Sequence, residues 1–240
     1  MHYARWLYLI LAFLMFSLAM MMYAWRPDLR RPILVTGAMG SIIEIGSDLA
    51  WYLRDYWHPP TILPVPVIED ALFGFGVTAF AACAVPFWCL RQYVPKTGVT
   101  SVNSSDIIRR VATLLLCFAV AVSVLQALTS INSIWLATTC FLIAGVVASI
   151  MQADVWWVGP VAGLIMGILA LGGYFLGLDI LIDGDAFLRQ VYVLYGTRLD
   201  MRIPGTNVLL DELVWFFARG WCMASLYTLL TQQRLQRLRP

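Results

Sequence analysis

The sequence predicts an all-α, polytopic integral membrane protein with about seven transmembrane helices. Hydrophobic residues make up 61% of the 240 residues, charged residues make up 12%, and the net charge is +2. Soluble domains carry about 25% charged residues, so this composition excludes a soluble domain. The small net charge and the scattered basic clusters also argue against a nucleic-acid partner.

Seven apolar stretches approach the roughly 20 residues that a helix needs to cross a bilayer. The first is longer than the apolar core of a secretory signal peptide, and no small-residue cleavage site follows it, which predicts a retained helix. We treat residues 1–240 as a single membrane domain. The predicted helices cover residues 4–25, 32–52, 67–91, 108–129, 134–152, 156–178 and 208–232.

The basic residues predict the orientation. If the helices alternate in direction, ten arginine and lysine residues fall on one side of the bilayer and five on the other. The richer side is expected to be cytoplasmic, which places the N-terminus outside and the C-terminus in the cytoplasm, and we expect a bacterial inner membrane. The ten are Arg26, Arg30, Arg31, Arg91, Lys96, Arg109, Arg110, Arg234, Arg237 and Arg239, and the five are Arg5, Arg54, Arg189, Arg198 and Arg202.

Two pairs of acidic residues open apolar stretches that could otherwise cross the membrane. These pairs are Glu69 with Asp70 and Asp211 with Glu212. Ionisable groups at membrane depth cost several kcal/mol and are usually retained for a polar pathway, a partner or chemistry. Both pairs are followed by two apolar residues and an aromatic one. This shared order predicts a duplicated unit, with one half over residues 1–95 and the other over 106–240.

Further charged residues are expected near these pairs. On the predicted topology Glu44 and Asp48 lie in the same leaflet as the four acids. Arg219 is the only arginine well inside an apolar stretch and needs a partner there. Counting the helical rise from the predicted boundaries gives Arg219 and Glu44 nearly the same depth. We therefore predict an interhelical ion pair between Glu44 and Arg219, with Asp48, one turn above, as the alternative partner.

Small residues and loops give weaker signals. Glycines at four-residue spacing predict close helix packing in lipid, and the five cysteines, which lack CxxC spacing, are expected to be small core residues. The 53–66 loop is expected to form a stiff turn at the membrane interface. Residues 187–195 form either a short interfacial helix that caps a cavity or an ordinary solvated loop. The glycines are Gly159, Gly163, Gly167, Gly173 and Gly177.

The acidic motifs resemble those of the membrane-embedded lycopene cyclase domain family. The resemblance rests on the two segments 68–73 and 210–215, each of which leads into a long apolar helix. The segments 26–32 and 51–57 are similar to bacterial members of that family. The resemblance covers most of the chain, although the motifs that carry it are short.

The chain also departs from the family pattern. Val67 and Leu209 stand where proline is usual two residues before the first acid, and Asp211 stands where glutamate is more common. Thr228 follows Tyr227 where another acid is expected. These departures bear more on the activity than on the domain assignment.

The resemblance implies acid-initiated cyclisation of the end group of a linear polyene, a carotenoid or another lipid-soluble isoprenoid. This isomerisation needs proton delivery to a double bond, stabilisation of a carbocation and loss of a proton, without a metal or cofactor. A desolvated carboxyl beside a second carboxyl has a raised pKa and can act as the proton donor. The implied catalytic residues are Glu69, Asp70, Asp211 and Glu212.

Adjacent helix residues point about 100° apart, so one acid of each pair is expected to face the cavity. We favour Glu69 and Glu212, because Gly76 on the face of Glu69 would leave room for a bulky ligand. Aromatic rings are expected to stabilise the cation. The expected substrate-binding residues are Phe73, Gly76, Trp215, Phe216, Arg219, Glu44 and Asp48.

Other functions stay open. The acids could merely cap helix N-termini. The NxxxD and DxxxD spacings at 207–211 and 179–183 are found in membrane prenyltransferases, where carboxylates hold magnesium against a diphosphate. The chain could also bind a lipid or carotenoid without reaction, or support a homo- or hetero-oligomeric complex. A retinal photoreceptor is excluded, because the only lysine, Lys96, lies in a loop.

Overall fold

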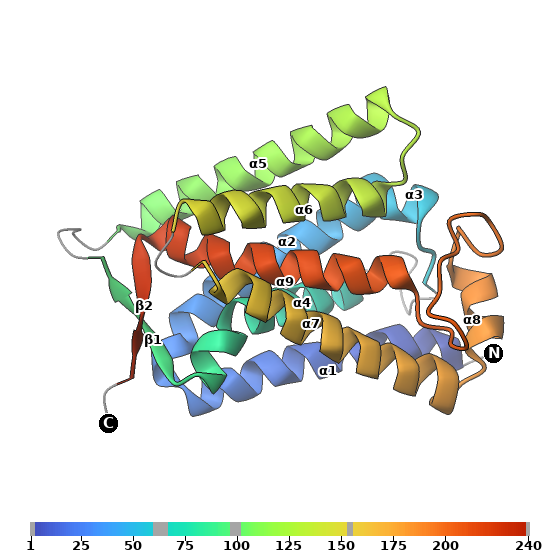
Figure 1. Ribbon diagram of the computed structural model, residues 1–240, viewed down its shortest axis with the longest axis horizontal. Coiled ribbons are helices and arrows are strands. Elements are labelled where there is room, and N and C mark those ends of the chain that lie inside the picture. Colours follow the sequence, from blue (N-terminus) through green and yellow to red (C-terminus); the bar gives the residue numbers. More distant parts are fainter. Residues whose placement is uncertain (1–2, 60–66, 97–101, 153–155, 239–240) are drawn as a thin grey trace.

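The computed structural model describes residues 3–59, 67–96, 102–152 and 156–238. Within these ranges seven helical spans are long and apolar enough to cross a membrane, which confirms the all-α polytopic fold (Figure 1). The spans are α1 (Tyr3–Trp25), α2 (Arg30–Ser47) continued by η2 (Asp48–Tyr52) and α3 (Leu53–Asp55), α4 (Val67–Trp88), α5 (Ser104–Leu128), α6 (Ser133–Ile150), α7 (Val158–Tyr174) continued by η3 (Phe175–Leu181), and α9 (Leu210–Thr231).

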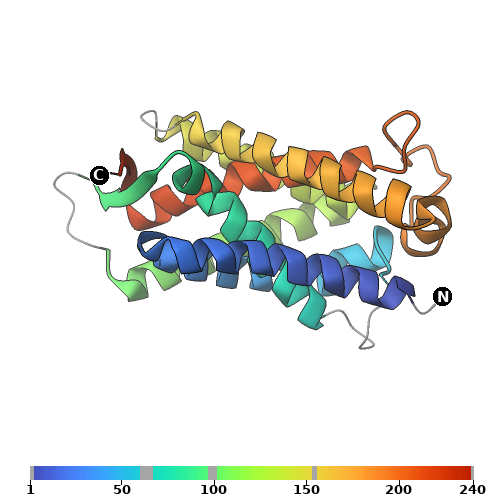
Figure 2. The ribbon, with the colours of Figure 1, turned by 90° about the horizontal axis from the view of Figure 1, so that it is seen from below.

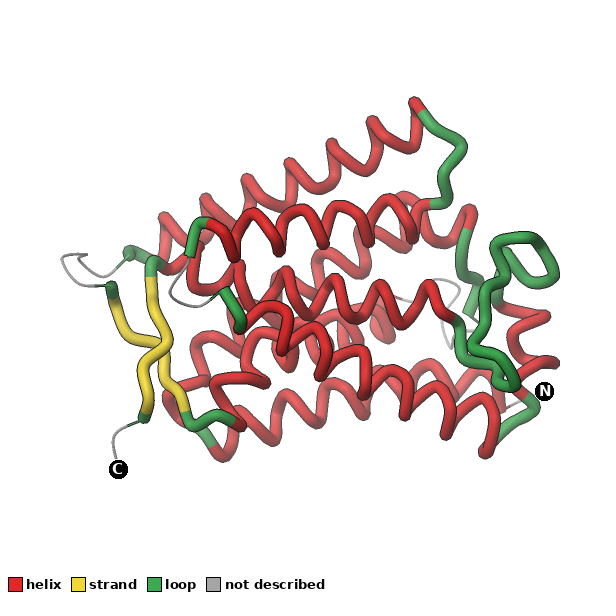
Figure 3. Tube along the Cα trace, viewed as in Figure 1, coloured by secondary structure: helices red, strands yellow, loops and turns green. Residues whose placement is uncertain are grey.

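Shorter elements lie at the two ends of the bundle. The turn η1 (Pro27–Leu29) joins α1 to α2, and α8 (Gly184–Val191) lies between α7 and α9. Two strands, β1 (Arg91–Pro95) and β2 (Gln233–Arg237), lie at the opposite end of the bundle from α8, which is labelled in Figure 1; the strands are yellow in Figure 3. We call the two ends of the bundle the α8 end and the ribbon end.

Local sequence explains where two helices begin. The side chain of Asn132 accepts a hydrogen bond from the backbone N–H of Ile134 at 3.0 Å and caps α6. Asp183 accepts one from the backbone N–H of Ala186 at 3.1 Å and caps α8. Such side chains satisfy backbone donors that the first helical turn leaves without partners.

The helices α4 and α9 form the centre of the bundle and pack against each other. Helices α1 and α2 flank α4, and α6 and α7 flank α9 (Figures 1 and 2). Helix α5 packs mainly on α6 and α9 and buries only Ile107 and Val122 among its residues. One face of α5, with Leu115 and Phe118, packs on the core, whereas Leu116, Val120 and Val124 are exposed, as expected for a helix in contact with lipid.

Small residues allow the closest helix contacts. A Cβ on Gly40 would collide with the backbone of Gly74, so α2 and α4 need both glycines. A Cβ on Gly76 would collide with the backbone of α1 at Met15 and Phe16. Gly76 therefore makes room for a neighbouring helix, and the expectation that it makes room for a ligand is wrong. Gly159, by contrast, packs on α9 at Trp221 as predicted.

The paired strands were not predicted from the sequence. Strands β1 and β2 pair antiparallel, with Tyr93 opposite Leu235. Helix α4 ends at Trp88, so the predicted helix over residues 67–91 is too long. Leu90 and Gln232, which precede the two strands, both adopt left-handed backbone conformations, with φ of 48° and 53°. Each residue reverses the chain at the end of a central helix.

The two halves share further features. Helices α4 and α9 each contain 22 residues, and each leads into one strand of the ribbon. Asp211 follows Glu69 at the same sequence interval as Gln232 follows Leu90. Duplication of a unit would produce these correspondences. These correspondences support the predicted division of the chain into halves at 1–95 and 106–240, which stays a prediction.

The cysteines differ from one another in burial. All five are free thiols, and Cys83 and Cys222 are buried as expected for core residues. Cys140 is half-buried, whereas Cys89 and Cys117 are exposed. The expectation of core packing is therefore wrong for these last two residues.

Candidate functional site

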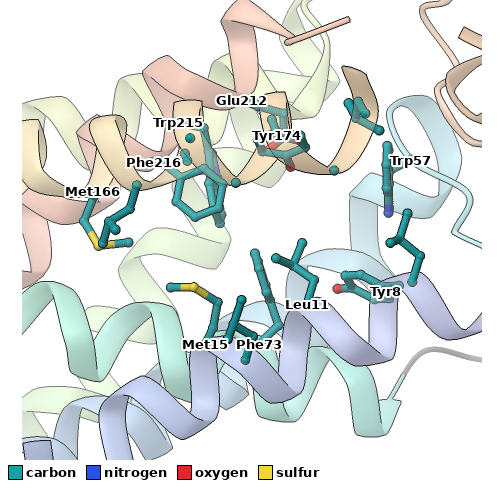
Figure 4. Close-up of a pocket in the computed structure, with 18 of the residues that line it drawn as sticks. Tyr8, Leu11, Met15, Trp57, Phe73, Met166, Tyr174, Glu212, Trp215 and Phe216 are labelled. Atoms are coloured by element: carbon teal, nitrogen blue, oxygen red, sulfur yellow. The ribbon is translucent and has the colours of Figure 1, made fainter. Parts of the chain in front are cut away.

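A cavity of about 390 Å³ lies between α1 and α7, with one residue of α4 and three of α9 in its wall. Figure 4 shows Tyr8, Leu11, Met15 and Phe73 on one side of the space and Met166, Trp215 and Phe216 on the other. Most of the lining is aliphatic or aromatic. Three acids also line it, and they are Glu44, Asp48 and Glu212.

Glu212 is the acid that α9 contributes to the cavity. It lies in the first turn of the helix and is buried. The hydroxyl of Tyr56 donates a hydrogen bond of 2.6 Å to Glu212 Oε1, and Tyr174 is a second hydrogen-bond partner. Both tyrosines line the cavity. Two phenols therefore hold one carboxyl group against an apolar space.

A second acidic group lies on α2, η2 and α4. Asp48 lines the cavity and interacts with Asp70 through their carboxyl groups. The hydroxyl of Tyr8 donates a hydrogen bond of 2.7 Å to Asp70 Oδ1. Asp70 itself does not line the cavity. Tyr8, which does, lies between Asp70 and the cavity. The two acidic groups thus have the same construction, in which a tyrosine at the cavity surface binds a buried carboxyl.

The structure brings only part of the predicted site to the cavity. Glu212 faces it as expected, whereas Glu69 is buried away from it, so the expectation for Glu69 is wrong. Asp211 is also outside the lining and accepts a hydrogen bond of 2.7 Å from the Tyr192 hydroxyl. The single residue from α4 in the lining is Phe73.

The predicted ion pair between Glu44 and Arg219 is confirmed. Arg219 Nη1 donates to Glu44 Oε2, and Nη2 donates to Thr78 Oγ1 at 2.9 Å. The Arg219 guanidinium also lies over the Trp215 ring, with Cζ 4.6 Å from the centroid. Arg219 is fully buried and is not part of the cavity lining. It links α9 to α2 and α4 and does not reach a ligand in the cavity.

Three predicted aromatic residues form one cluster at the cavity wall. The rings of Phe73 and Trp215 are stacked at 6.5 Å with an interplanar angle of 9°. Phe216 meets Phe73 edge-on at 6.0 Å and Trp215 edge-on at 5.0 Å. These are favourable geometries for aromatic pairs, so the three rings stabilise one another's positions.

The α8 end of the cavity is covered by a short helix. Helix α8 spans Gly184–Val191, and its Phe187 lines the cavity. The Phe187 ring packs edge-on against the Trp57 ring, with 6.1 Å between the ring centroids. The sequence allowed either a helix or a loop over residues 187–195, and the structure has a helix. This helix begins at residue 184, three residues before the predicted start. The predicted turn over 53–66 lies partly outside the described residues. Within them, Trp57 forms a β-bridge with Tyr192.

Ion pairs hold the segment beyond α8 in place. Asp185 accepts hydrogen bonds from Tyr195 at 2.8 Å, from Arg202 at 3.1 Å and from Arg189 at 2.8 Å. These hydrogen bonds lower the pKa of Asp185 below its ordinary value, and the bond from Tyr195 has the largest effect. The hydrogen bond to Asp200 raises the pKa of Arg202. These ion pairs act in addition to the apolar packing of the segment, in which Leu194, Val208 and Leu209 are buried.

The tyrosines were missed by the sequence reasoning. Tyr8, Tyr56, Tyr174 and Tyr192 each present a hydroxyl to a buried acid. A buried tyrosine hydroxyl needs a hydrogen-bond partner, and this requirement could have indicated contacts between the tyrosines and the buried acids. Tyrosines near the ends of membrane spans are common at the lipid interface, which conceals that signal.

The residues of the prenyltransferase-like spacings have other partners. Asp179 Oδ1 accepts hydrogen bonds from the backbone N–H and the side-chain amide of Asn207, both at 2.8 Å. Asp183 caps α8. In the part of the chain that the structure describes, no three histidine, cysteine or acidic side chains are grouped as metal ligands.

The chain was compared with protein families, curated proteins and solved structures. No family model, no curated protein and no solved structure matches it.

Proposed function

We propose that this chain is a membrane isomerase that cyclises the end group of a linear polyene, in the manner that its resemblance to the lycopene cyclase domain implies. One observation carries the proposal. Glu212 presents a tyrosine-bound carboxyl to a cavity whose remaining walls are mostly aliphatic and aromatic. A hydrocarbon end group fits such a space, and a carboxylic acid is the proton donor that its double bond requires.

The proposed reaction begins with proton transfer from the Glu212 carboxyl to one carbon of the terminal double bond. The resulting cation accepts the electron pair of an internal double bond, which forms the carbon–carbon bond that closes the ring. A ring carbon then loses a proton and a new double bond remains. One proton enters and one leaves, so the product is an isomer of the substrate.

The acceptor of the departing proton is Asp48 in this proposal. Asp48 lines the same cavity as Glu212 and interacts with Asp70, and a hydrogen bond between two carboxyl groups requires only one proton between them. The pair can therefore hold one further proton. Proton exchange with water then restores both acids.

Aromatic side chains stabilise the cation in this scheme. Phe73 and Phe216 both line the cavity. Trp215 is less suited, because the Arg219 guanidinium already lies over its ring. A nearby positive charge disfavours a second cation at the same ring. The main cation–π contribution is therefore assigned to Phe73 and Phe216.

Expression in a host that accumulates lycopene, followed by chromatography of the carotenoids, tests the proposal. We expect one-ring or two-ring products with the wild-type chain and none with Glu212→Gln. The matched control is Asp106→Asn, which removes an exposed carboxylate at the start of α5, far along the sequence from the cavity residues. Retained production of rings by Glu212→Gln would contradict the proposed role of the acid.

A second candidate is a protein that binds a polyene or lipid without reaction. The open, mainly apolar cavity favours it, because binding alone needs no acid. The two functions differ in one measurement. A binding protein would co-purify with lycopene and yield no cyclic product, and Glu212→Gln would leave the bound pigment unchanged.

A further inference from the structure

The cavity is continuous with the outer surface of the membrane-spanning helices. Leu14 on α1 and Ile168 on α7 line the cavity and are nevertheless 54% and 67% exposed. Leu176 on η3 also lines it and is 50% exposed. These apolar side chains belong to spans that lie in the bilayer. The cavity therefore opens between α1 and α7 towards lipid.

Among the residues that the structure describes, side chains cover the cavity in two other directions. Trp57 and Phe187 lie over it at the α8 end. Met166, which is fully buried, lies in its wall on α7, and the aromatic cluster of Phe73, Trp215 and Phe216 lies behind it on α4 and α9. Access from the bilayer is thus the route that this arrangement favours.

The glycines of α7 and η3 fall into two groups, one that packs against α9 and one that lines the cavity. A Cβ on Gly159 or Gly163 would collide with α9. A Cβ on Gly173 or Gly177 would meet no atom within 4 Å, so the expectation that these two pack against a helix is wrong. Both line the cavity instead.

Helix geometry shows where a side chain at Gly173 would point. Residues 166, 170 and 173 lie on one face of an α-helix, because positions three and four apart are neighbours. Met166 and Ala170 on that face are buried and line the cavity. A side chain at position 173 would therefore enter the cavity near its opening.

We propose that the opening between α1 and α7 is a lateral portal through which one end of an elongated apolar chain enters from the bilayer, with Gly173 and Gly177 keeping it wide enough. The cavity of about 390 Å³ is at the lower end of the roughly 300–1,000 Å³ of small-molecule sites. It encloses an end group, and the rest of a long chain stays in lipid. This inference deepens the proposed function, and its test does not depend on cyclisation.

The test uses phosphatidylcholine vesicles that contain a trace of phosphatidylcholine with a diazirine in one acyl chain. After irradiation, mass spectrometry locates the labelled residues. In the wild-type chain we expect label on Met15 and Phe73, which are buried among the helices but keep some accessible surface and line the cavity, as well as on the lipid-facing Ile143. Label on Ile143 without any on Met15 or Phe73 would overturn the portal.

Gly173→Leu should lower the labelling of Phe73 about tenfold relative to Ile143, because the leucine occupies the path of the chain. It should fold normally, since the added Cβ meets nothing and leucine favours a helix more than glycine does. Gly46→Leu is the matched control. Gly46 is also an open position in a membrane helix but does not line the cavity, so its labelling pattern should stay that of the wild type. Unchanged Phe73 labelling in Gly173→Leu would remove the role assigned to the glycine.

The labelling and the carotenoid experiment separate the two proposals. Labelled cavity residues without any ring product would leave the portal standing and remove the cyclase. Ring product without labelled cavity residues would retain the cyclase and remove the portal.

Discussion

Arg219 on α9 donates a hydrogen bond to Glu44 on α2, and both side chains are buried between membrane-spanning helices. Thr78 on α4 accepts a second bond from the same guanidinium at 2.9 Å. Three helices are therefore joined at one cation. The pair lies beside the cavity, because Glu44 lines it and Trp215, under the guanidinium, is part of the aromatic wall.

Removing either member of this pair should destabilise the protein. Glu44→Gln and Arg219→Gln should each lower the free energy of unfolding by about 3–5 kcal/mol, because each strands the opposite charge in a buried site. The double variant should recover part of that loss. Thermal unfolding in detergent measures the effect. The exposed pair Arg109–Asp106 is the control, since Asp106→Asn should cost no more than about 1 kcal/mol. Strictly additive losses for Glu44 and Arg219 would show that the two side chains do not stabilise each other.

Tyr56→Phe should slow the proposed reaction without preventing binding. The hydroxyl holds Glu212 Oε1 at 2.6 Å, and its loss leaves the carboxyl with Tyr174 as its remaining tyrosine partner and less firmly oriented towards the substrate. Glu212 becomes a carboxylate as it gives up its proton, and a hydrogen bond to a charged group contributes about 1.5–3 kcal/mol, so kcat should fall roughly 10- to 100-fold while KM stays near that of the wild type. The pH profile of kcat should shift as well, because Tyr56 is a hydrogen-bond partner of the proton donor. A change confined to KM, with the pH profile of the wild type, would contradict this positioning role.

The segment between α8 and α9 should loosen in acid. Its hydrogen bonds lower the pKa of Asp185 in the folded state, so the stabilisation is present above the unfolded pKa of about 3.9 and is lost as the pH falls through the lower folded value. Limited proteolysis of residues 184–209 should therefore accelerate below about pH 4. Asp185→Asn should give faster cleavage already at neutral pH and weaken the pH dependence. The part that remains is assigned to Asp200, whose desolvation is outweighed by hydrogen bonds from Arg202 and Gly196, so that its pKa is lowered as well. An unchanged cleavage rate in that variant would show that other contacts fix the segment.

The orientation of the chain can be tested by cysteine labelling. In a cysteine-free background, Ser104→Cys should react only from the cytoplasm and Arg198→Cys only from outside, because the basic residues favour the ribbon end as cytoplasmic. Both positions are exposed. A membrane-impermeant maleimide applied to intact cells, compared with permeabilised cells, measures the difference. Labelling of Ser104→Cys in intact cells would reverse the topology.

The seven spans could be predicted because each is a local property of composition and length. The paired strands could not, because Arg91–Pro95 and Gln233–Arg237 are far apart in the sequence and only their pairing makes them strands. The ion pair between Glu44 and Arg219 could be predicted from depth alone, since a buried cation requires a partner and few acids lie at that level.

The candidate site was harder to predict, because adjacent residues point about 100° apart and small rotations of a helix decide which one is exposed to a cavity. Glu212 faces the cavity and Glu69 does not, although both open a central helix. The tyrosine partners depend on contacts between helices that sequence spacing does not contain. Gly163 and Gly173 belong to the same predicted pattern, yet one packs on α9 and the other lines the cavity.

The most direct measurement of the central claim is the rate of ring formation from lycopene by the purified chain in nanodiscs, with Glu212→Gln compared with the wild type. Loss of a general acid typically costs 10²–10⁴-fold, so we predict a rate lower by roughly that factor, with lycopene still retained by the variant. Asp106→Asn should keep the wild-type rate. Ring formation by Glu212→Gln at the rate of the wild type would contradict the account.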